Sequence, residues 1–101
     1  MWLFVLFDLP VLEPEERRAY ARFRKDLLEQ GFSMLQYSVY VRFCENEDAG
    51  EVPRRRIKAC IPPDGQVRLV AITDRQFAKM DVFLGKRPCR PEDPPPLLLL
   101  M

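Results

Sequence analysis

The hydrophobic pattern of the chain begins with seven apolar residues, which are followed at once by Asp8 and then by Pro10. A short run of aromatic and branched side chains predicts a β-strand that is buried on both faces. Successive strand side chains alternate between faces, so Asp8 shares its face with the even-numbered residues of the run. Pro10 ends the strand because proline cannot donate to a strand ladder. The sequence therefore places one carboxylate at the rim of an apolar strand.

A first helix is predicted by apolar residues that recur at spacings of three and four after Pro14. Proline and acidic residues suit the first turn of a helix, because its N–H groups lack intrahelical partners and it carries the positive end of the helix dipole. Gly31 is the expected stop. We therefore expect a helix from Pro14 to Gln30 whose core-facing residues are Tyr20, Phe23, Leu27 and Leu28.

The remaining pattern predicts alternating extended and helical segments. Residues 32–43 read as one long extended stretch that bends or bulges near residues 36–38. After it we expect a polar loop over residues 46–50, a helix from Val52 to Ile61, a turn at residues 62–65, a strand from Gln66 to Thr73, a helical turn from Asp74 to Met80 and a short strand over residues 82–84. This order predicts an α+β fold of the ferredoxin-like type, β-α-β-β-α-β, with an antiparallel sheet and two helices on one face.

Two helices can cover only one face of such a sheet, yet the first strand is apolar on both faces. The uncovered face would expose either Trp2, Phe4 and Leu6 or the odd-numbered alternative, Leu3, Val5 and Phe7. An exposed apolar patch usually marks an interface, and a two-fold dimer is the commonest way to bury one. We therefore expect a homodimer. If the uncovered face is that of Asp8, two copies of this residue approach each other across the dimer axis.

The residues alone leave two interpretations of Asp8 open. Its carboxylate can accept backbone N–H groups of the following loop, as Asp often does, or it can hold a metal or take part in catalysis. The chain has no histidine, the usual general base and nitrogen ligand, and its three cysteines are too widely separated for a zinc site or a disulfide framework. Any metal should therefore be a hard cation bound through oxygen, Mg²⁺, Mn²⁺ or Ca²⁺.

The length of 101 residues suits a single domain, with residues 1–85 as the folded part and residues 86–101 as a proline- and leucine-rich tail. In this tail, Pro94–Pro96 precede Leu97–Leu100, which suggests either a stiff arm that places leucines on a partner or an unstructured end. The leucine run is too short to span a bilayer, and the first residues lack the basic segment and cleavage site of a signal peptide. We expect a cytoplasmic protein that does not bind membranes.

The formal charge of +1, from 16 basic and 15 acidic residues, carries no overall signature of nucleic-acid binding. The arginines nevertheless cluster on the two predicted helices and at the end of one strand. Solvated helix faces, paired with neighbouring glutamates, are the ordinary explanation for such clusters. A run of three arginines, doubled in a dimer, also suits the repeating phosphates of a long polyanion. The candidate nucleic-acid-binding residues are Arg17, Arg18, Arg42, Arg54, Arg55 and Arg56.

Short motifs follow one another along residues 1–85. They are Phe7–Pro10, Arg17–Arg18, Tyr20, Phe23–Lys25, Gly31–Phe32, Leu35–Tyr40, Val67–Leu69 and Thr73–Phe77. Each motif is weak alone, but together their order and spacing are specific, and they resemble those of the small CRISPR-associated protein Cas-two (Cas2) family. Leu35–Tyr40 and Asp74–Phe77 are most similar to the versions from type II CRISPR systems, and a toxin-associated ribonuclease family of the VapD kind shares the fold.

The resemblance implies a homodimeric ferredoxin-like protein that works with the CRISPR integrase Cas-one (Cas1) in spacer acquisition, as part of the defence against foreign DNA. The Cas2 dimer would hold double-stranded spacer DNA while Cas1 carries out strand transfer. The family is also described as metal-dependent endonucleases acting on RNA or DNA, and Asp8 matches the catalytic aspartate that holds Mg²⁺. The alternatives are a stand-alone metal-dependent ribonuclease of the VapD-like toxin type and a regulatory dimer without a nucleic-acid partner.

Overall fold

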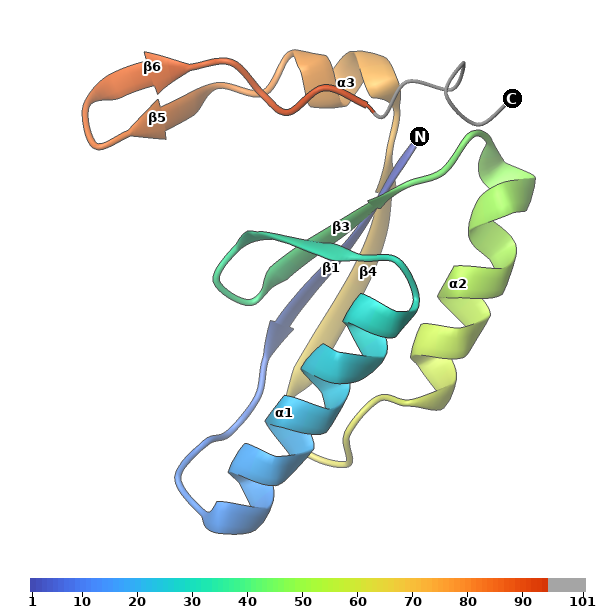
Figure 1. The fold of residues 1–101 in the computed structure, drawn as a ribbon, viewed down its shortest axis with the longest axis vertical. Helices are drawn as coiled ribbons and strands as arrows, with labels where there is room; N and C mark the ends of the chain where they lie inside the picture. Colours follow the sequence, from blue (N-terminus) through green and yellow to red (C-terminus); the bar gives the residue numbers. More distant parts are fainter. Residues whose placement is uncertain (95–101) are drawn as a thin grey trace.

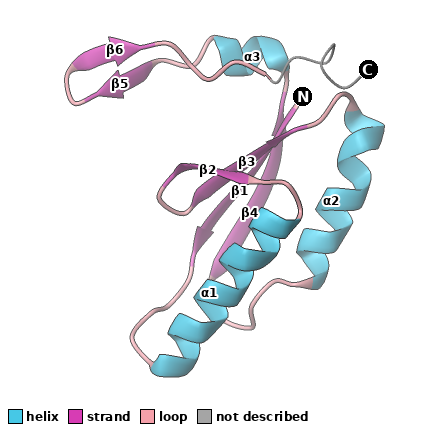
Figure 2. Cartoon of the chain, in the orientation of Figure 1, coloured by secondary structure: helices cyan, strands magenta, loops and turns pink. Residues whose placement is uncertain are grey.

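The computed structural model describes residues 1–94, which build a four-stranded antiparallel sheet with two long helices packed on one face (Figure 1). The strand order is β2-β3-β1-β4, and β1 pairs antiparallel with β3 on one side and with β4 on the other. This is the ferredoxin-like arrangement predicted from the order of elements. Figure 2 separates helices from strands, whose bounds are β1 Trp2–Asp8, α1 Pro14–Glu29, β2 Ser33–Gln36, β3 Val39–Phe43, α2 Glu47–Ala59, β4 Gln66–Ile72, α3 Asp74–Ala78, β5 Val82–Leu84 and β6 Arg87–Cys89.

Helix α1 begins at the predicted residue and ends one residue before the predicted end at Gln30, because both of its ends are stabilised locally. At its start, the Glu16 carboxylate accepts the backbone N–H groups of Leu12 (3.1 Å) and Glu13 (2.8 Å), which satisfies donors that have no partner inside the helix. At its end, Gly31 has φ +84°, a left-handed conformation that suits glycine. Two backbone bonds then close the last turn, from Gly31 to the Leu28 carbonyl and from Phe32 to the Leu27 carbonyl.

The main core lies between the sheet and the two long helices. The odd-numbered residues of β1 point into it, and Leu3 and Val5 are completely buried. They pack with Phe23 and Leu27 of α1 and with Ile57 of α2. Each fully buried side chain of this size stabilises the fold by roughly 1.5–3 kcal/mol. Phe23 and Leu27 therefore have the role that the apolar spacing of α1 predicted, whereas the prediction for Leu28 is wrong, because its side chain is 45% exposed.

The opposite face of the sheet is covered in part by the short helix α3. Phe77 of α3 stacks on Trp2 with ring centroids 4.0 Å apart and contacts Phe4 at 5.9 Å. Trp2 and Phe4 are consequently only 6% and 7% exposed. The prediction that this face would leave both residues exposed is wrong, because the segment after β4 folds back over it. Farther along β1, Leu6 is partly exposed and Asp8 is exposed.

Residues 32–43 form a hairpin rather than one extended stretch. Strands β2 and β3 pair antiparallel, with a register irregularity between Met34 and Gln36. Ser38 in the connecting turn has φ +62°, a conformation that costs energy for residues other than glycine. Its carbonyl accepts the Phe7 N–H at 3.1 Å. This contact with β1 holds a turn that has no local glycine or proline signal, which is why the sequence indicated only a bend.

Helix α2 begins at Glu47, five residues before the predicted start at Val52. The Asn46 side chain accepts the Ala49 N–H at 2.9 Å and caps the helix. The predicted polar loop is therefore the first turn of α2. Pro53, which was placed near the helix start, lies inside the helix and is buried. The cap and the acidic first turn outweighed the preference of proline for a first turn.

The chain beyond α3 forms a second, two-stranded sheet of β5 and β6, which pair only with each other within the described residues. Figure 1 shows this hairpin projecting away from the four-stranded sheet. It crosses the expected boundary at residue 85, and its turn contains Gly85 and Lys86. The predicted leucine arm, Leu97–Leu100, lies outside the described residues. Within residues 1–94, no helix has the length and apolar character needed to cross a membrane.

Candidate nucleic-acid interface

Asp8 lies at the last position of β1, at a corner where three segments meet. Its Cα is paired with that of Gln66 at the start of β4. Gly65 approaches so closely that an added Cβ would lie 2.6 Å from the Asp8 carbonyl oxygen, and its φ of +95° also requires glycine. The preceding residue, Phe7, is bonded to the Ser38 carbonyl of the β2–β3 turn. The backbone of Asp8 is thus fixed while its side chain is exposed.

The carboxylate of Asp8 accepts no hydrogen bond and forms no ion pair with any side chain or backbone group of residues 1–94. The alternative role as a cap for the following loop is therefore not realised. Nor does this part of the chain contain a group of three or more Asp, Glu, Cys or His side chains that could hold a metal ion. Mg²⁺ is commonly bound through one or two carboxylates, with water and phosphate filling its other positions. Each protomer can therefore supply one carboxylate at this position, that of Asp8, to such an ion.

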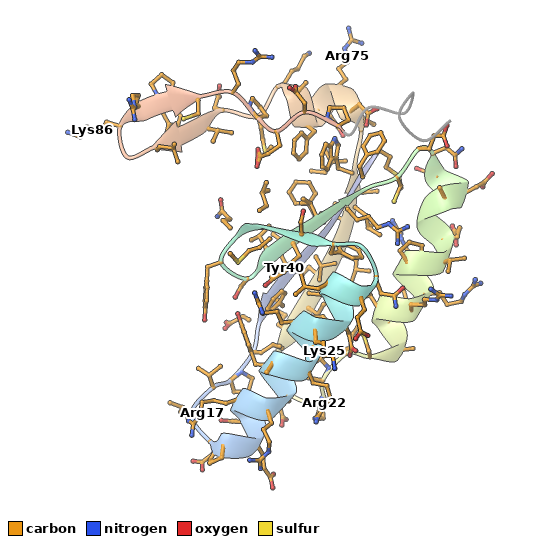
Figure 3. The ribbon with its side chains drawn as sticks, viewed as in Figure 1. Arg17, Arg22, Lys25, Tyr40, Arg75 and Lys86 are labelled. Atoms are coloured by element: carbon orange, nitrogen blue, oxygen red, sulfur yellow. The ribbon has the colours of Figure 1, made fainter. Side chains whose placement is uncertain are left out.

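Arg17 organises the loop between β1 and α1. Its Nη1 donates to the backbone carbonyls of Leu12 (2.7 Å) and Val11 (3.2 Å). Figure 3 shows Arg17 near the amino-terminal end of α1. Both acceptors are neutral, so these bonds orient the guanidinium without cancelling its charge. The predicted phosphate-binding role of Arg17 therefore has a charged group available for it.

Arg18, the neighbouring candidate, lines a surface cleft of about 400 Å³ between α1 and the loop that precedes β4. Apolar groups, among them Leu9, Pro10 and Tyr20, form part of its wall. The charged residues of the cleft are Glu15, Glu16, Asp64, Arg18 and Arg22. With three carboxylates against two guanidinium groups, the cleft does not favour a polyanion.

Arg42 and Arg56 meet at the carboxyl-terminal end of α1, around Gln30. Arg42 Nη1 donates to the Gln30 backbone carbonyl at 2.5 Å, and Arg56 Nη1 donates to the Gln30 side-chain oxygen at 3.3 Å. A cation suits this position because the helix dipole is negative there. Burial raises the pKa of the Cys44 thiol, and the positive charges of Arg42 and Arg54 oppose that shift.

The structure thus divides the predicted arginines into two groups rather than one. Arg17 and Arg18 lie at the start of α1, on the side of the β1–α1 loop that follows Asp8. Arg42 and Arg56 meet at Gln30 near the end of α1, and Arg54 and Arg55 lie on α2. From Arg17 to Gln30, the distance along the helix axis is about 20 Å. A nucleic acid that contacts both must extend along α1.

Three side chains between α1 and the β2–β3 hairpin were not chosen as site residues from the sequence. Arg24 Nε donates to the Tyr40 hydroxyl at 2.8 Å. Tyr37, in the β2–β3 turn, is 76% exposed, and its ring lies nearly parallel to that of Tyr20, with centroids 6.4 Å apart. The neighbouring Tyr20 side chain raises the pKa of Tyr37. Recognising a turn at residues 37–38 would have indicated that this aromatic ring is presented to solvent.

The arginines are not engaged in ion pairs. Among residues 1–94, the ion pairs within 4.0 Å are those of the Met1 amino group with Asp74 and of Lys25 with Glu29. Pairing of these arginines with Glu15, Glu16 or Glu51 is therefore not realised within residues 1–94, whereas the solvated helix faces of the ordinary explanation are present, since Arg17, Arg18 and Arg55 are exposed. Glu16 instead accepts backbone N–H groups at the start of α1.

Comparison with known proteins identifies the family. A family model described as "CRISPR associated protein Cas2" matches residues 1–80. A protein of Parvibaculum lavamentivorans is 52% identical over 86% of each chain, and one of Ligilactobacillus salivarius is 45% identical over 86% of each chain. A protein of Flavobacterium psychrophilum is 43% identical over 93% of this chain and 82% of its own. All three are named CRISPR-associated endoribonuclease Cas2.

These matches cover the sheet, both long helices and the corner that carries Asp8. They agree with the order of motifs from Phe7–Pro10 to Thr73–Phe77 that first indicated this family. The chain belongs to the CRISPR-associated protein Cas2 family.

Proposed function

We propose that the protein is a CRISPR adaptation subunit that binds spacer DNA as a homodimer, together with the Cas1 integrase, during spacer acquisition. The observation that carries this proposal is the state of its arginines: Arg17, Arg24 and Arg42 are oriented by neutral acceptors, and no arginine is paired with a carboxylate within residues 1–94. Such groups can neutralise phosphates without first breaking an ion pair. Phosphate contacts position a duplex without reading its sequence, which suits a protein that must accept spacers of any sequence.

Dimerisation is supported by two exposed apolar features. On the face opposite the long helices, Leu6 is partly exposed and Val70 is 44% exposed. On β5, Phe83 and Leu84 are 59% and 66% exposed. An isolated two-stranded hairpin is marginally stable in water, and β4 is an edge strand with a free side. A second protomer that receives the β5–β6 hairpin on its open face would cover both features.

Binding to duplex DNA tests the proposal through its dependence on salt. Each lost phosphate contact should reduce the slope of log K against log [salt] by about one. We expect reduced slopes in Arg17→Ala/Arg18→Ala and in Arg54→Ala/Arg55→Ala, with no dependence on DNA sequence. Lys25→Ala, which removes the cation of an exposed ion pair with Glu29, is the matched control. Unchanged slopes in both double variants would contradict the proposal.

A second candidate function is metal-dependent cleavage of RNA or DNA, because the relatives are named endoribonucleases and Asp8 is exposed and unpaired within residues 1–94. Two Asp8 carboxylates in a dimer would hold Mg²⁺ or Mn²⁺, which would supply an activated water for phosphodiester hydrolysis. The match to Cas2 relatives favours this assignment over a stand-alone VapD-like toxin.

Cleavage by this route should require a divalent metal and should be lost in Asp8→Ala. The Asp8→Asn variant keeps the shape of the side chain and removes the charge, so it should lose cleavage as well. Both variants should retain duplex binding, because Asp8 contacts no arginine within the described residues. Cleavage that survives in EDTA, or in both variants, would contradict a role for Asp8.

A further inference from the structure

A groove lies at the edge of the four-stranded sheet, beside the start of β2. Its volume is about 540 Å³, and its apolar lining comes from β1, β2 and β3. Trp2 and Val41 are buried there, Leu35 and Phe43 are partly exposed, and Met34 is 56% exposed. Within residues 1–94, β2 pairs only with β3, so the backbone groups on its outer edge have no strand partner. The groove therefore joins an apolar surface to an open strand edge.

The carboxyl-terminal segment of the described chain leads into this groove. Glu92 and Asp93 form part of its wall. The seven residues after Pro94 begin with two prolines and continue with the four leucines Leu97–Leu100. Two prolines advance a chain by about 6 Å, and five further residues span up to about 17 Å. Strand β2, with four residues, is about 13 Å long. The leucines can therefore reach every part of β2 that borders the groove.

The leucines also match the groove in chemistry. They carry no charge, and four consecutive leucines in water are unfavourable unless an apolar surface covers them. Proline has no backbone N–H, so pairing with the open edge of β2 can begin only after residue 96, which is where the leucines begin. A segment of the same chain also reaches the groove at a high effective concentration, because it is covalently linked to the groove wall.

Two other occupants fit the groove less well. A polyanion is disfavoured because the carboxylates of Glu92 and Asp93 outnumber the one cation of the lining, Arg42. A second protomer, in the dimer proposed above, covers Leu6, Val70 and the edge of β4. Strands β4 and β2 lie at opposite edges of the sheet, so such a dimer leaves the groove uncovered. Distance and chemistry thus favour the leucines of the same chain.

We propose that Leu97–Leu100 dock in the groove of their own chain and cover the edge of β2. Their side chains pack against Leu35, Val41 and Phe43. An open strand edge beside apolar side chains can pair with other chains and cause aggregation, and the docked leucines block this edge. The open edge of the four-stranded sheet is then that of β4, where the proposed dimer forms.

Hydrogen exchange measured by mass spectrometry tests the docking from the side of the groove. The amides of Ser33–Gln36 should exchange about tenfold faster when all four leucines are replaced by serine, because the edge of β2 then loses its cover. The amides of β1 lie inside the sheet, so they are the internal reference and should not change. Protection of β2 should be equal at low and high protein concentration, because a contact within one chain does not depend on concentration.

Thermolysin, which cleaves before leucine, tests the docking from the side of the leucines. Met34→Asp places a charge in the groove at a side chain that is already exposed, and it should speed cleavage at residues 97–100 by about tenfold. Leu28→Asp is the matched control, because Leu28 is 45% exposed but lies on α1 and does not line the groove. Its cleavage rate should equal that of the unaltered protein.

Three results would overturn the inference. The first is unchanged exchange of β2 in the serine variant, and the second is equal cleavage of Met34→Asp and Leu28→Asp. The third is protection of β2 that rises with protein concentration, which would assign the groove to the leucines of a second copy.

Discussion

The substitution Arg42→Met tests whether a residue chosen for phosphate binding also stabilises the fold. In the structure, its guanidinium donates to the Gln30 carbonyl at 2.5 Å, at the carboxyl-terminal end of α1. The side chain also lies against Gly31, where an added Cβ would be 3.5 Å from Arg42 Nε. Methionine keeps an unbranched apolar side chain over Gly31 and removes the charge and the donor.

The size of the effect follows from the contact that is lost. A hydrogen bond from a charged donor stabilises a protein by about 1.5–3 kcal/mol, and a cation at the end of a helix by about 0.3–1 kcal/mol. Because these effects overlap in one group, we expect Arg42→Met to reduce the free energy of unfolding by about 2 kcal/mol. With a urea dependence of about 2 kcal/mol per molar for a small protein, the unfolding midpoint should fall by about 1 M.

Urea unfolding followed by circular dichroism measures this change. Protein concentration must be held constant, because association raises the apparent stability. Arg55→Met is the matched control, since Arg55 is exposed on α2 and donates to no group within residues 1–94. Arg55→Met should change the free energy of unfolding by no more than about 0.5 kcal/mol, so its unfolding midpoint should hardly move. An unchanged midpoint in Arg42→Met would refute the capping role, and the salt dependence of DNA binding by the same variant would show whether the guanidinium also meets a phosphate.

Three further outcomes are expected. Phe77→Ala should destabilise the protein by about 3–5 kcal/mol in urea unfolding, because it removes a buried ring that stacks on Trp2; a loss under 1 kcal/mol would mean that α3 does not cover the sheet. Light scattering should give twice the chain mass of 11.9 kDa, and Leu84→Glu should shift it towards the monomer, whereas a stable monomer of the unaltered protein at micromolar concentration would contradict the dimer. Cys44 should react with iodoacetamide at pH 8 more slowly than Cys89, measured by mass spectrometry, because burial raises the pKa of its thiol and leaves less of the reactive thiolate; equal rates would contradict this.

Local signals explain what could be predicted of the fold. Strand β1 and helix α1 were predicted with nearly their observed bounds, because the apolar run, the proline after Asp8 and Gly31 act within a few residues. The turn at Ser38 could not be predicted in the same way. Its left-handed backbone is held by a bond from Phe7, about thirty residues away in the chain. The covering of Trp2 by Phe77 depends on a similar long-range contact.

The site shows the same division between local and long-range information. The position of Asp8 at an exposed strand end follows from the sequence, because Pro10 stops the strand. The partners of the arginines do not, since Arg42 reaches Gln30 and Arg24 reaches Tyr40 only after the helix has packed on the sheet. The exposure of Tyr37 could not be predicted for a related reason, because the sequence indicated a continuous extended stretch and not a turn at this residue.

The central claim, that the protein acts in spacer acquisition, is tested most directly by a prespacer integration assay with the Cas1 integrase of its own CRISPR locus. The account predicts that Cas1 alone integrates poorly, that adding the protein stimulates integration, and that Asp8→Ala stimulates as well as the unaltered protein. It also predicts that Arg17→Ala/Arg18→Ala stimulates less. Integration by Cas1 that is equally efficient with and without the protein would contradict the account.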